Sequence, residues 1–402
     1  MFRKVRIFFP FVCLCGLVCG QRSATISNKE PRKSTDGNVL NAHSGTIVYV
    51  NGTYFMYGEY YGRGPYIVTG NELFPKLSVY TSTDMVTWNY GGLLHNNSKG
   101  VEGAPPVWSE SPHWKYHPKG TWWSPSAVYD KRSDSIIIWF SASPGECCSA
   151  YFGIAKSRNG VNFELVSLSE TPATNVSVDG SSVLIDDDGE GYVAYTAMGV
   201  PGQDAHVVAI DKLTDDYLGT AKTQVGNFFP DPFVEGVMLF KRKGVYYLLY
   251  GSCCCACREG SGAVVHMAKD IAGPWTRQPG GDMNCKAGED VKVCAGMPAG
   301  AKRDRPTGEL IINAQGIGLS VLPTSSTGEE NTYLWMGSRW LSAPHNNPKC
   351  TSLCSTCERD HGFNGYVRGN DFEYWIPLEF NDKTGYVHKF KNFVNSYQLE
   401  IP

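Results

Sequence analysis

The feature that most constrains the fold is a short strand that recurs along the chain, each time beside a tight turn. Aromatic and β-branched residues fill five such strands: N-G-T-Y-F-M-Y-G at 51–58, R-S-D-S-I-I-I-W-F at 132–140, D-D-G-E-G-Y-V-A-Y-T at 187–196, R-K-G-V-Y-Y-L-L-Y-G at 242–251 and E-N-T-Y-L-W-M-G at 330–337. Asn-Gly, Asp-Gly and Lys-Gly pairs favour the two-residue turns of antiparallel hairpins. Helical periodicity is scarce, so the pattern predicts an all-β chain.

A second element, consisting of a strand, a turn and an aromatic residue, follows several of these hairpins. It occurs at 78–88, 152–163 and 264–275. Radial repetition of small antiparallel sheets explains such units, and five of them predict a five-bladed β-propeller. A two-sheet sandwich is the alternative, but it does not explain the repeated unit. Because no proline- or serine-rich linker divides the chain, we expect one propeller domain over 38–402.

The N-terminus predicts export. M-F-R-K-V-R is basic, the next 13 residues carry no charge, and Val18 and Gly20 precede Gln21 in the pattern of a signal-peptidase site. As a helix this stretch covers about 20 Å, less than the roughly 30 Å membrane core, so a retained anchor is the weaker alternative. We therefore expect a signal peptide at 1–20, an N-terminal extension at 21–37 and a secreted protein.

Export also decides how the cysteines are interpreted. Loss of the signal peptide leaves 11 of the 14 cysteines, and thiols pair in an oxidising compartment. Disulfides are expected among Cys147, Cys148, Cys253, Cys254, Cys255, Cys257, Cys285, Cys294, Cys350, Cys354 and Cys357. We predict that they staple long loops at one rim, with one thiol left over. A zinc site that uses the C-x-x-C of 254–257 is the less favoured alternative.

Sequons and charge describe the expected surface. Asn51, Asn96 and Asn175 open N-x-S/T sequons and predict glycosylation. The net charge of −3 becomes −6 once the three basic residues of the signal peptide are removed. This mild acidity offers no basic field for nucleic acid or anionic membrane. We expect a monomer without metal or cofactor, whose partner is a polysaccharide or oligosaccharide.

Two carboxylates stand where a propeller would place its chemistry. Asp179, in S-V-D-G-S-S-V-L-I, and Glu235, in D-P-F-V-E-G-V-M-L-F, each precede an apolar strand. Taken singly, either is better explained as a turn or strand-end carboxylate bonded to backbone. Because they occupy equivalent points of successive repeats, we predict that both point toward the axis.

Several motifs, in order, resemble the exo-β-1,3-galactanase branch of glycoside hydrolase family 43, whose members are five-bladed propellers. The resemblance covers most of 38–380. It rests on N-A-H-S-G-T-I-V-Y-V-N-G-T-Y-F-M-Y-G-E at 41–59, V-D-G-S-S-V-L-I-D-D-D-G-E-G-Y at 178–192, V-E-G-V-M-L-F-K-R-K-G-V-Y-Y-L-L at 234–249, N-A-Q-G-I-G-L-S-V-L-P at 313–323, M-G-S-R-W at 336–340 and Y-W-I-P-L-E-F at 374–380.

The resemblance implies three catalytic residues. Glu235 matches the general acid, which needs a raised pKa, and Asp179 matches the carboxylate that maintains it by like-charge repulsion. Where most of the family has a base aspartate, this chain reads N-A-H-S-G. Gln315 matches the glutamine thought to orient the attacking water in this branch; a buried structural amide is the alternative. Inverting chemistry implies that base and acid stand about 6.5–9.5 Å apart.

The resemblance also implies a substrate site, and here the chain departs from the branch. Glu59 and His43 match pocket residues, and Arg339 and Trp340 belong to the closing motif. Trp123 stands in place of a substrate-binding glutamate, and a ring can stack on a sugar but cannot accept its hydroxyl hydrogens. Ser338 replaces the aspartate of the closing motif.

The function implied is inverting hydrolysis of β-1,3-galactan, the arabinogalactan backbone, from the non-reducing end. Two alternatives stay open. One is an α-L-arabinofuranosidase or β-xylosidase of the same fold. The other is a catalytically silent carbohydrate-binding propeller, which the missing base carboxylate and Trp123 favour.

Overall fold

Five blade sheets and one two-stranded sheet account for almost all of the regular structure of the described residues. The computed structural model describes residues 22–62, 76–94, 121–143, 150–202, 206–231, 234–252, 258–286, 310–325, 330–344 and 366–402. Among these residues the helical structure is one 3₁₀ turn, η1 (Arg368–Asn370). The all-β prediction is confirmed.

The sheets follow one another along the chain, each a meander of neighbouring antiparallel strands. Blade one holds β2 (His43–Val50), β3 (Thr53–Tyr60), β4 (Lys76–Ser82) and β5 (Asn89–Leu93), and blade two holds β6 (Thr121–Asp130), β7 (Ser135–Ser143), β8 (Tyr151–Ser157) and β9 (Glu164–Glu170). Blade three holds β10 (Ser177–Ile185), β11 (Gly191–Met198), β12 (Val207–Leu213) and β13 (Thr220–Gln224). Blade four holds β14 (Val234–Arg242), β15 (Val245–Ser252), β16 (Val264–Ala268) and β17 (Thr276–Arg277), and blade five holds β18 (Gln315–Pro323), β19 (Asn331–Arg339) and β20 (Phe372–Pro377).

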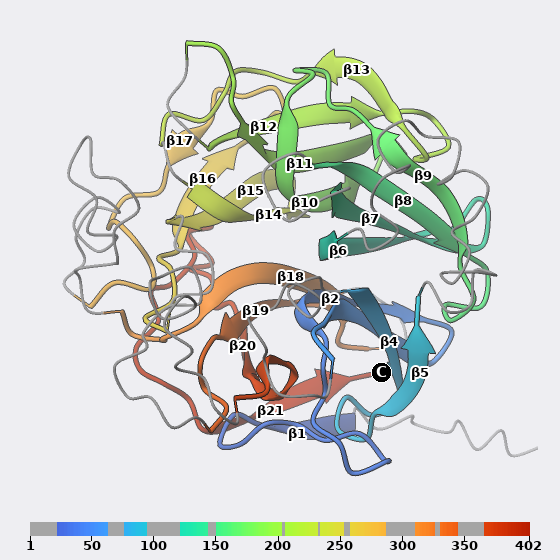
Figure 1. Cartoon of the computed structure of the whole chain (residues 1–402). Coiled ribbons are helices and arrows are strands. Elements are labelled where there is room, and N and C mark those ends of the chain that lie inside the picture. Colours follow the sequence, from blue (N-terminus) through green and yellow to red (C-terminus); the bar gives the residue numbers. More distant parts are fainter. Residues whose placement is uncertain are drawn as a thin grey trace, which may run out of the picture.

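The first strand of every blade lies next to the axis. β2, β6, β10, β14 and β18 contact one another in a closed ring, while β5, β9 and β13 lie at the periphery (Figure 1). A sandwich of two sheets would not close such a ring. The five-bladed propeller is therefore confirmed.

The repeated turns of the sequence have physical causes that the structure makes visible. The β2–β3 hairpin turns at Asn51 and Gly52, both with positive φ (49° and 83°), as a type I′ turn requires. In the turn after β4, the Asp84 carboxylate accepts the amides of Val86 and Thr87 at 2.9 and 2.6 Å. Trp88 is fully buried after that turn. The strand–turn–aromatic unit is thus the link between the third and fourth strands.

A two-stranded ribbon joins the two ends of the described chain. β1 (Arg22–Ser27), within the predicted extension, pairs antiparallel with β21 (Ser396–Ile401), with Arg22 opposite Ile401. Apolar side chains of the ribbon share one hydrophobic cluster with side chains of blade one and blade five. In Figure 1 the ribbon lies beside β20. It thus covers the seam where the ring closes.

Most of the predicted cysteine and glycan positions fall outside the described residues. Of the eleven cysteines only Cys285 is described; it is buried and disulfide-bonded, so its partner lies outside the described ranges. The pairing of the other ten stays a prediction. Asn51 and Asn175 are exposed at positive φ, where a glycan would have room, and Asn96 is not described.

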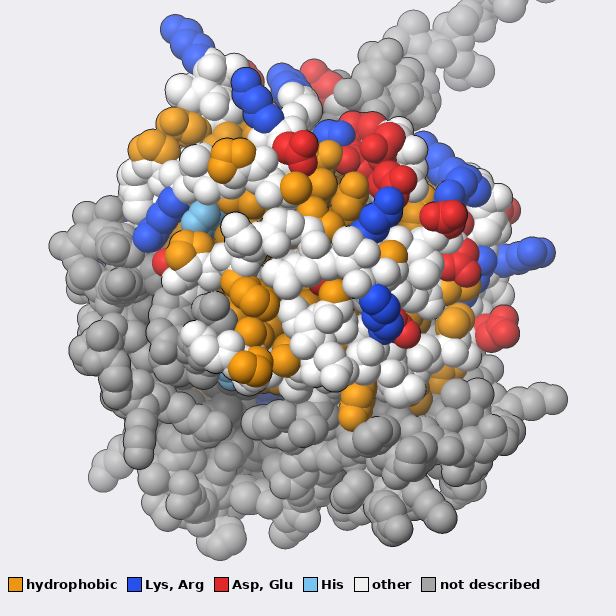
Figure 2. Space-filling model, turned by 90° about the horizontal axis from the view of Figure 1, so that it is seen from above, with side chains coloured by type: hydrophobic (Ala, Val, Ile, Leu, Met, Phe, Trp, Pro, Cys, Tyr) orange, Lys and Arg blue, Asp and Glu red, His pale blue; other side chains and the backbone are white. Residues whose placement is uncertain are grey.

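Acidic and basic side chains are interspersed over the face seen in Figure 2. No group of three or more His, Cys, Asp or Glu side chains in the described ranges is arranged to hold a metal ion. The described part of the chain also contains no helix long and apolar enough to cross a membrane.

Candidate active site

Each inner strand carries one predicted site residue near its start. These residues are His43 on β2, Trp123 on β6, Asp179 on β10, Glu235 on β14 and Gln315 on β18. The pairing with the second strand shifts register directly after the first four, and one residue later in β18. Such bulges bend a strand and re-aim its side chains. Five strands of different sequence therefore converge at equivalent points.

The residue after the site residue adopts a left-handed conformation in four blades. φ is 51° at Ser44, 48° at Ser124, 63° at Gly180 and 70° at Gly236. Glycine adopts this conformation freely, whereas a residue with a Cβ loses about 1–2 kcal/mol there. Blades three and four, which carry the carboxylates, use glycine, and blades one and two use serine.

Asp179 and Glu235 form a buried acidic pair. The indole nitrogen Nε1 of Trp123 donates to Asp179 Oδ1 at 2.5 Å. His206 Nδ1 lies 3.4 Å from Glu235 Oε1. Burial, and then the Glu235 carboxylate, raise the pKa of Asp179 to about 7, while Trp123 and His206 oppose the shift. The pair therefore retains a proton near neutral pH, as a general acid requires.

Gln315 touches this pair directly. Its Nε2 donates to Glu235 Oε2 at 3.3 Å, and its Oε1 accepts the indole N–H of Trp340 at 2.7 Å. An indole can only donate, so the contact with Trp340 fixes which end of the amide is the oxygen. The amide nitrogen therefore faces the carboxylate.

The expected separation of 6.5–9.5 Å between base and acid is wrong for this structure, because Gln315 Nε2 stands 3.3 Å from Glu235 Oε2. The physical reason is the charge of the groups. Two carboxylates repel each other and leave room for water, whereas an amide N–H is attracted to a carboxylate and closes the gap.

His43 occupies the place of the family's base and is held by blade five. Its ring is fully buried, and Nδ1 lies 2.9 Å from Glu373 Oε1. The ring centroids of Tyr61 and Trp340 lie 5.5 and 5.6 Å away. Near His43, Ser338 Oγ accepts the amide of Ser44 at 3.1 Å, so the serine that replaces the motif's aspartate fastens blade one to blade five.

Glu59, on β3, is a second buried carboxylate of the site. Its Oε1 accepts the amide of Ser124 at 2.9 Å, and its Oε2 accepts the Tyr61 hydroxyl. Burial raises the pKa of Glu59, and both hydrogen bonds oppose that shift. Arg368 donates to the Tyr61 hydroxyl at 3.0 Å and lies 3.8 Å from that ring's centroid. Glu59 is thus connected to blade two and to η1.

The structure does not bring Arg339 together with these residues. Its Nε donates to the carbonyl of Asn313 at 3.4 Å, and its guanidinium lies 5.6 Å from the ring of Phe372 and 5.0 Å from that of Phe393. The neighbouring Trp340 is the residue of the closing motif that reaches Gln315.

Sequence reasoning missed four residues of the site. They are Tyr61, His206, Arg368 and Glu373. His206 had no motif to mark it, but its carbonyl accepts the amide of Val234 at 3.2 Å and so lies beside the start of β14. Tyr61 lies two residues after the matched motif at 41–59, which was the one available signal.

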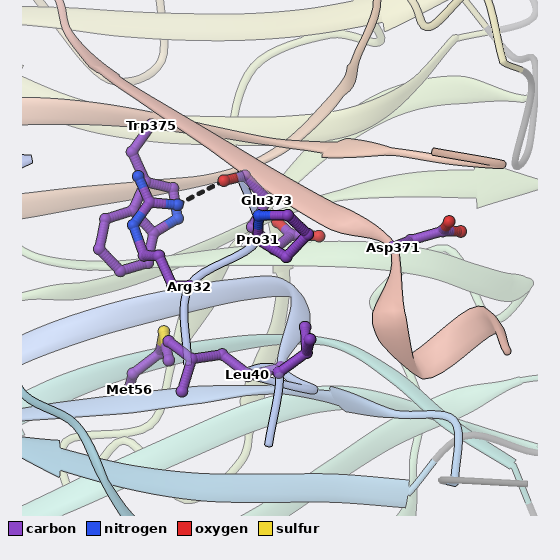
Figure 3. A pocket seen from close by; sticks show the side chains of 9 residues that line it. Pro31, Arg32, Leu40, Met56, Asp371, Glu373 and Trp375 are labelled. Atoms are coloured by element: carbon purple, nitrogen blue, oxygen red, sulfur yellow. Dashed lines mark hydrogen bonds between the residues drawn. The ribbon is translucent and has the colours of Figure 1, made fainter. Parts of the chain in front are cut away.

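A small cavity adjoins the back of Glu373 (Figure 3). Arg32, from the segment after β1, donates to the Glu373 carbonyl at 2.5 Å and lies 3.8 Å from the Trp375 ring centroid. Burial lowers the pKa of Arg32 to about 10, which leaves it charged at neutral pH. The N-terminal segment therefore supports the backbone of the residue that faces His43.

The fold has counterparts among known proteins. Residues 53–293 match the model of glycosyl hydrolases family 43. The chain belongs to this family. Family members hydrolyse glycosidic bonds, and the present chain has the family's fold over that range. No curated protein matches the chain significantly.

Solved structures agree on the fold. The exo-β-1,3-galactanase of Clostridium thermocellum has a TM-score of 0.61 and 20% identity, over 94% of this chain and 68% of that one. A family 43 β-1,3-galactosidase solved with galactodeoxynojirimycin has a TM-score of 0.60 and 17% identity, over 92% and 100%. A variant exo-β-1,3-galactanase of Phanerochaete chrysosporium with β-1,3-galactotriose has a TM-score of 0.58 and 16% identity, over 91% and 66%. At such identities the likeness is one of fold.

Proposed function

We propose that this family 43 protein is a secreted, monomeric, inverting exo-glycosidase that removes galactose from the non-reducing end of β-1,3-galactan. The observation that carries the proposal is the buried Asp179–Glu235 pair with the Gln315 amide against it, at the mouth of the inner strands. Similarly folded proteins described as β-1,3-galactanases and β-1,3-galactosidases support the substrate.

Glu235 is the general acid of the proposal. Its proton passes to the glycosidic oxygen as the bond to the anomeric carbon breaks, and the departing chain leaves as an alcohol. The proposal requires that the proton of the pair resides on Glu235 when the substrate is bound; an ionised Asp179 then keeps it there, because it disfavours a second negative charge nearby. His206 Nδ1 lies beside Oε1 of Glu235 and assists the reprotonation of this carboxylate between turnovers.

Gln315 orients the attacking water in this proposal. Its amide takes the imidic tautomer when one N–H proton moves to Oε1. The nitrogen of that form accepts a proton from water as the water oxygen bonds to the anomeric carbon, and release of the Oε1 proton to solvent then restores the amide. Trp340 holds the other end of the amide at 2.7 Å throughout. The contact between Gln315 and Glu235 closes the site before substrate arrives, so an incoming sugar must displace Nε2 from the carboxylate.

The remaining residues form the sugar subsite of the proposal. Glu59 accepts sugar hydroxyl hydrogens, the partly exposed ring of Trp123 stacks on a sugar face, and His43 lines the floor beside Trp340. Export with cleavage after Gly20, disulfide staples at the rim and glycans at the three sequons belong to the same proposal. Cleavage there leaves β1, which begins at Arg22, whole.

A catalytically silent carbohydrate-binding propeller is the second candidate. The specific observation in its favour is that the Gln315 amide is satisfied at both ends, by Glu235 and by Trp340. Such an amide is also what a purely structural residue would be.

One assay separates these candidates. The protein from an exporting host is incubated with β-1,3-galactan, arabinan and xylan, and released sugars and their first anomer are followed by NMR. We expect α-galactose from galactan alone, since inversion of a β-linkage gives the α-anomer, and no release by Glu235→Gln. Arabinose or xylose release would transfer the protein to another specificity, and binding without any release would establish the silent binder.

A further inference from the structure

We propose that Trp123 is a positioning residue for Asp179: its indole N–H, at 2.5 Å from Oδ1, stabilises the ionised form of this carboxylate and so favours the arrangement in which the proton shared by the pair resides on Glu235. The inference rests on the proposed function for the role of the pair, and it assigns to blade two a task that stacking on a sugar does not include.

The geometry that carries the inference connects three blades. Trp123 lies on β6, Asp179 on β10 and Glu235 on β14, so the indole approaches the pair from the side opposite to Glu235 in the order of the ring. An indole N–H is a donor and never an acceptor, so it bonds to a carboxylate oxygen that carries no proton. A glutamate at this position would have added a third negative charge instead.

The charges around Asp179 explain why one neutral hydrogen-bond donor can change which carboxylate of the pair holds the proton. Glu235 and Glu59 raise its pKa, whereas Trp123 and His206 lower it, and Trp123 is the larger of the two opposing influences. The pair holds one proton that can reside on either carboxylate. The donor favours the arrangement with the proton on Glu235, which is the only one that can protonate a leaving group.

The assignment also limits how Trp123 meets a sugar. The indole has a single polar hydrogen, and Asp179 takes it. The ring therefore offers a sugar its face and no hydrogen bond. A substrate whose recognition in blade two requires an acceptor would be disfavoured, and one with an apolar face at that place would be preferred.

The test is Trp123→Phe, which keeps a ring and removes the donor. The titration of the Asp179 carboxyl is followed by ¹³C NMR, with the resonance assigned through its loss in Asp179→Asn. We expect the midpoint to move up by at least half a pH unit. An unchanged midpoint in a folded variant would overturn the inference. Because no substrate is used, this readout stands even if the proposed galactanase activity fails.

Matched variants separate the donor from the ring. Trp340→Phe removes the other indole N–H of the site, whose acceptor is Gln315, and should leave the Asp179 midpoint within about 0.2 units. An equal shift in Trp340→Phe would show a general effect of losing an indole and would overturn the inference. If galactan is hydrolysed, Trp123→Phe should also lower kcat and move both limbs of the pH profile upward. A lower kcat with an unmoved profile would leave Trp123 only a packing role.

Discussion

The two halves of the site hold their polar groups in different ways. Asp179 and Glu235, from blades three and four, are like charges buried together; Trp123 donates to Asp179, and His206 and Gln315 lie beside Glu235. Gln315 and His43, from blades five and one, are uncharged or weakly basic groups fixed by neighbours on their own side of the ring. The acidic half, Asp179 and Glu235, thus consists of carboxylates that repel each other, whereas the neutral half, Gln315 and His43, is held by hydrogen bonds.

This difference teaches where each kind of chemistry can reside. A shared proton can be redistributed by small changes around the acidic half. On the neutral half, the family's base position is taken by a histidine that is buried against Glu373 and Trp340. The proposed function therefore assigns water activation to Gln315, the residue of that half that contacts Glu235.

Substitution of Glu235, the proposed proton donor of the acidic half, should have the largest effect on kcat. Glu235→Gln removes the transferable proton and keeps the shape, so we expect kcat on β-1,3-galactan to fall by up to about 10⁴-fold with binding retained. Initial rates and isothermal titration with galacto-oligosaccharides measure the two. Near-full activity would remove Glu235 from the role.

Loss of the amide of the neutral half should lower kcat less. Gln315→Ala leaves water unheld and should lower kcat about 10²-fold or more, whereas Gln315→Glu supplies an ordinary carboxylate base and should keep inverting hydrolysis. Thermal melts of both variants serve as the control for folding. If the alanine variant were as active as wild type at equal stability, the amide would be structural only.

The acidic half also has a signature in stability. Asp179 has a pKa of about 7 when folded and an ordinary value of 3.8, so the folded state binds the extra proton between these values. The free energy of unfolding contributed by this group therefore falls as pH rises from about 4 to 7, and the cost is complete above pH 7. Asp179→Asn removes this cost. The difference in free energy of unfolding between this variant and wild type, measured by urea unfolding, should therefore favour the variant more at pH 8 than at pH 4.

Asp84 provides a control of opposite sign. Burial raises its pKa, but hydrogen bonds from Thr87 and Val86 outweigh this and lower it overall. Asp84→Asn should therefore be less stable than wild type at pH 7, and the difference in the free energy of unfolding should shrink as pH falls below the ordinary value of 3.8. The same pH trend in both variants would contradict the difference drawn between the site and the turn.

The smallest effect on activity is expected from a change at His206, beside the acidic half. His206 lowers the pKa of Asp179, so His206→Gln should raise the proton affinity of Asp179, and the alkaline limb of the kcat profile should move up by less than about one unit. We expect kcat to change by less than tenfold. A shift of the limb to lower pH would contradict this placement of charge.

Sequence alone predicted the elements that repeat. Asn51-Gly52 and the motif around Asp84 encode their turns locally, and the matched strand starts of Asp179 and Glu235 placed both carboxylates at the axis. These features depend on residues a few positions apart. Local residue spacing therefore predicts these turns and strand starts, and the five-bladed architecture was inferred from their repetition.

The contacts between blades could not be predicted in the same way. The hydrogen bonds from Trp123 to Asp179 and from Gln315 to Glu235 join residues 56 and 80 positions apart. No local pattern states which side chain meets which across the ring. For the same reason Trp123 was predicted only as a stacking ring.

The ribbon of β1 and β21 has a consequence for when the site exists at all. Arg22 also donates to the carbonyl of Pro402, 380 positions away, so the ribbon is a clasp made of the first and last described strands. Gln315 and His43 come from the two blades that this clasp holds together, whereas the acidic half lies on the far side of the ring. We expect amide hydrogen exchange to be faster at the start of β2 and β18 than at the start of β10 and β14, and faster still when β1 is deleted; equal protection would contradict it. A nascent chain would then assemble its acid first and acquire its water-holding amide only at the final closure.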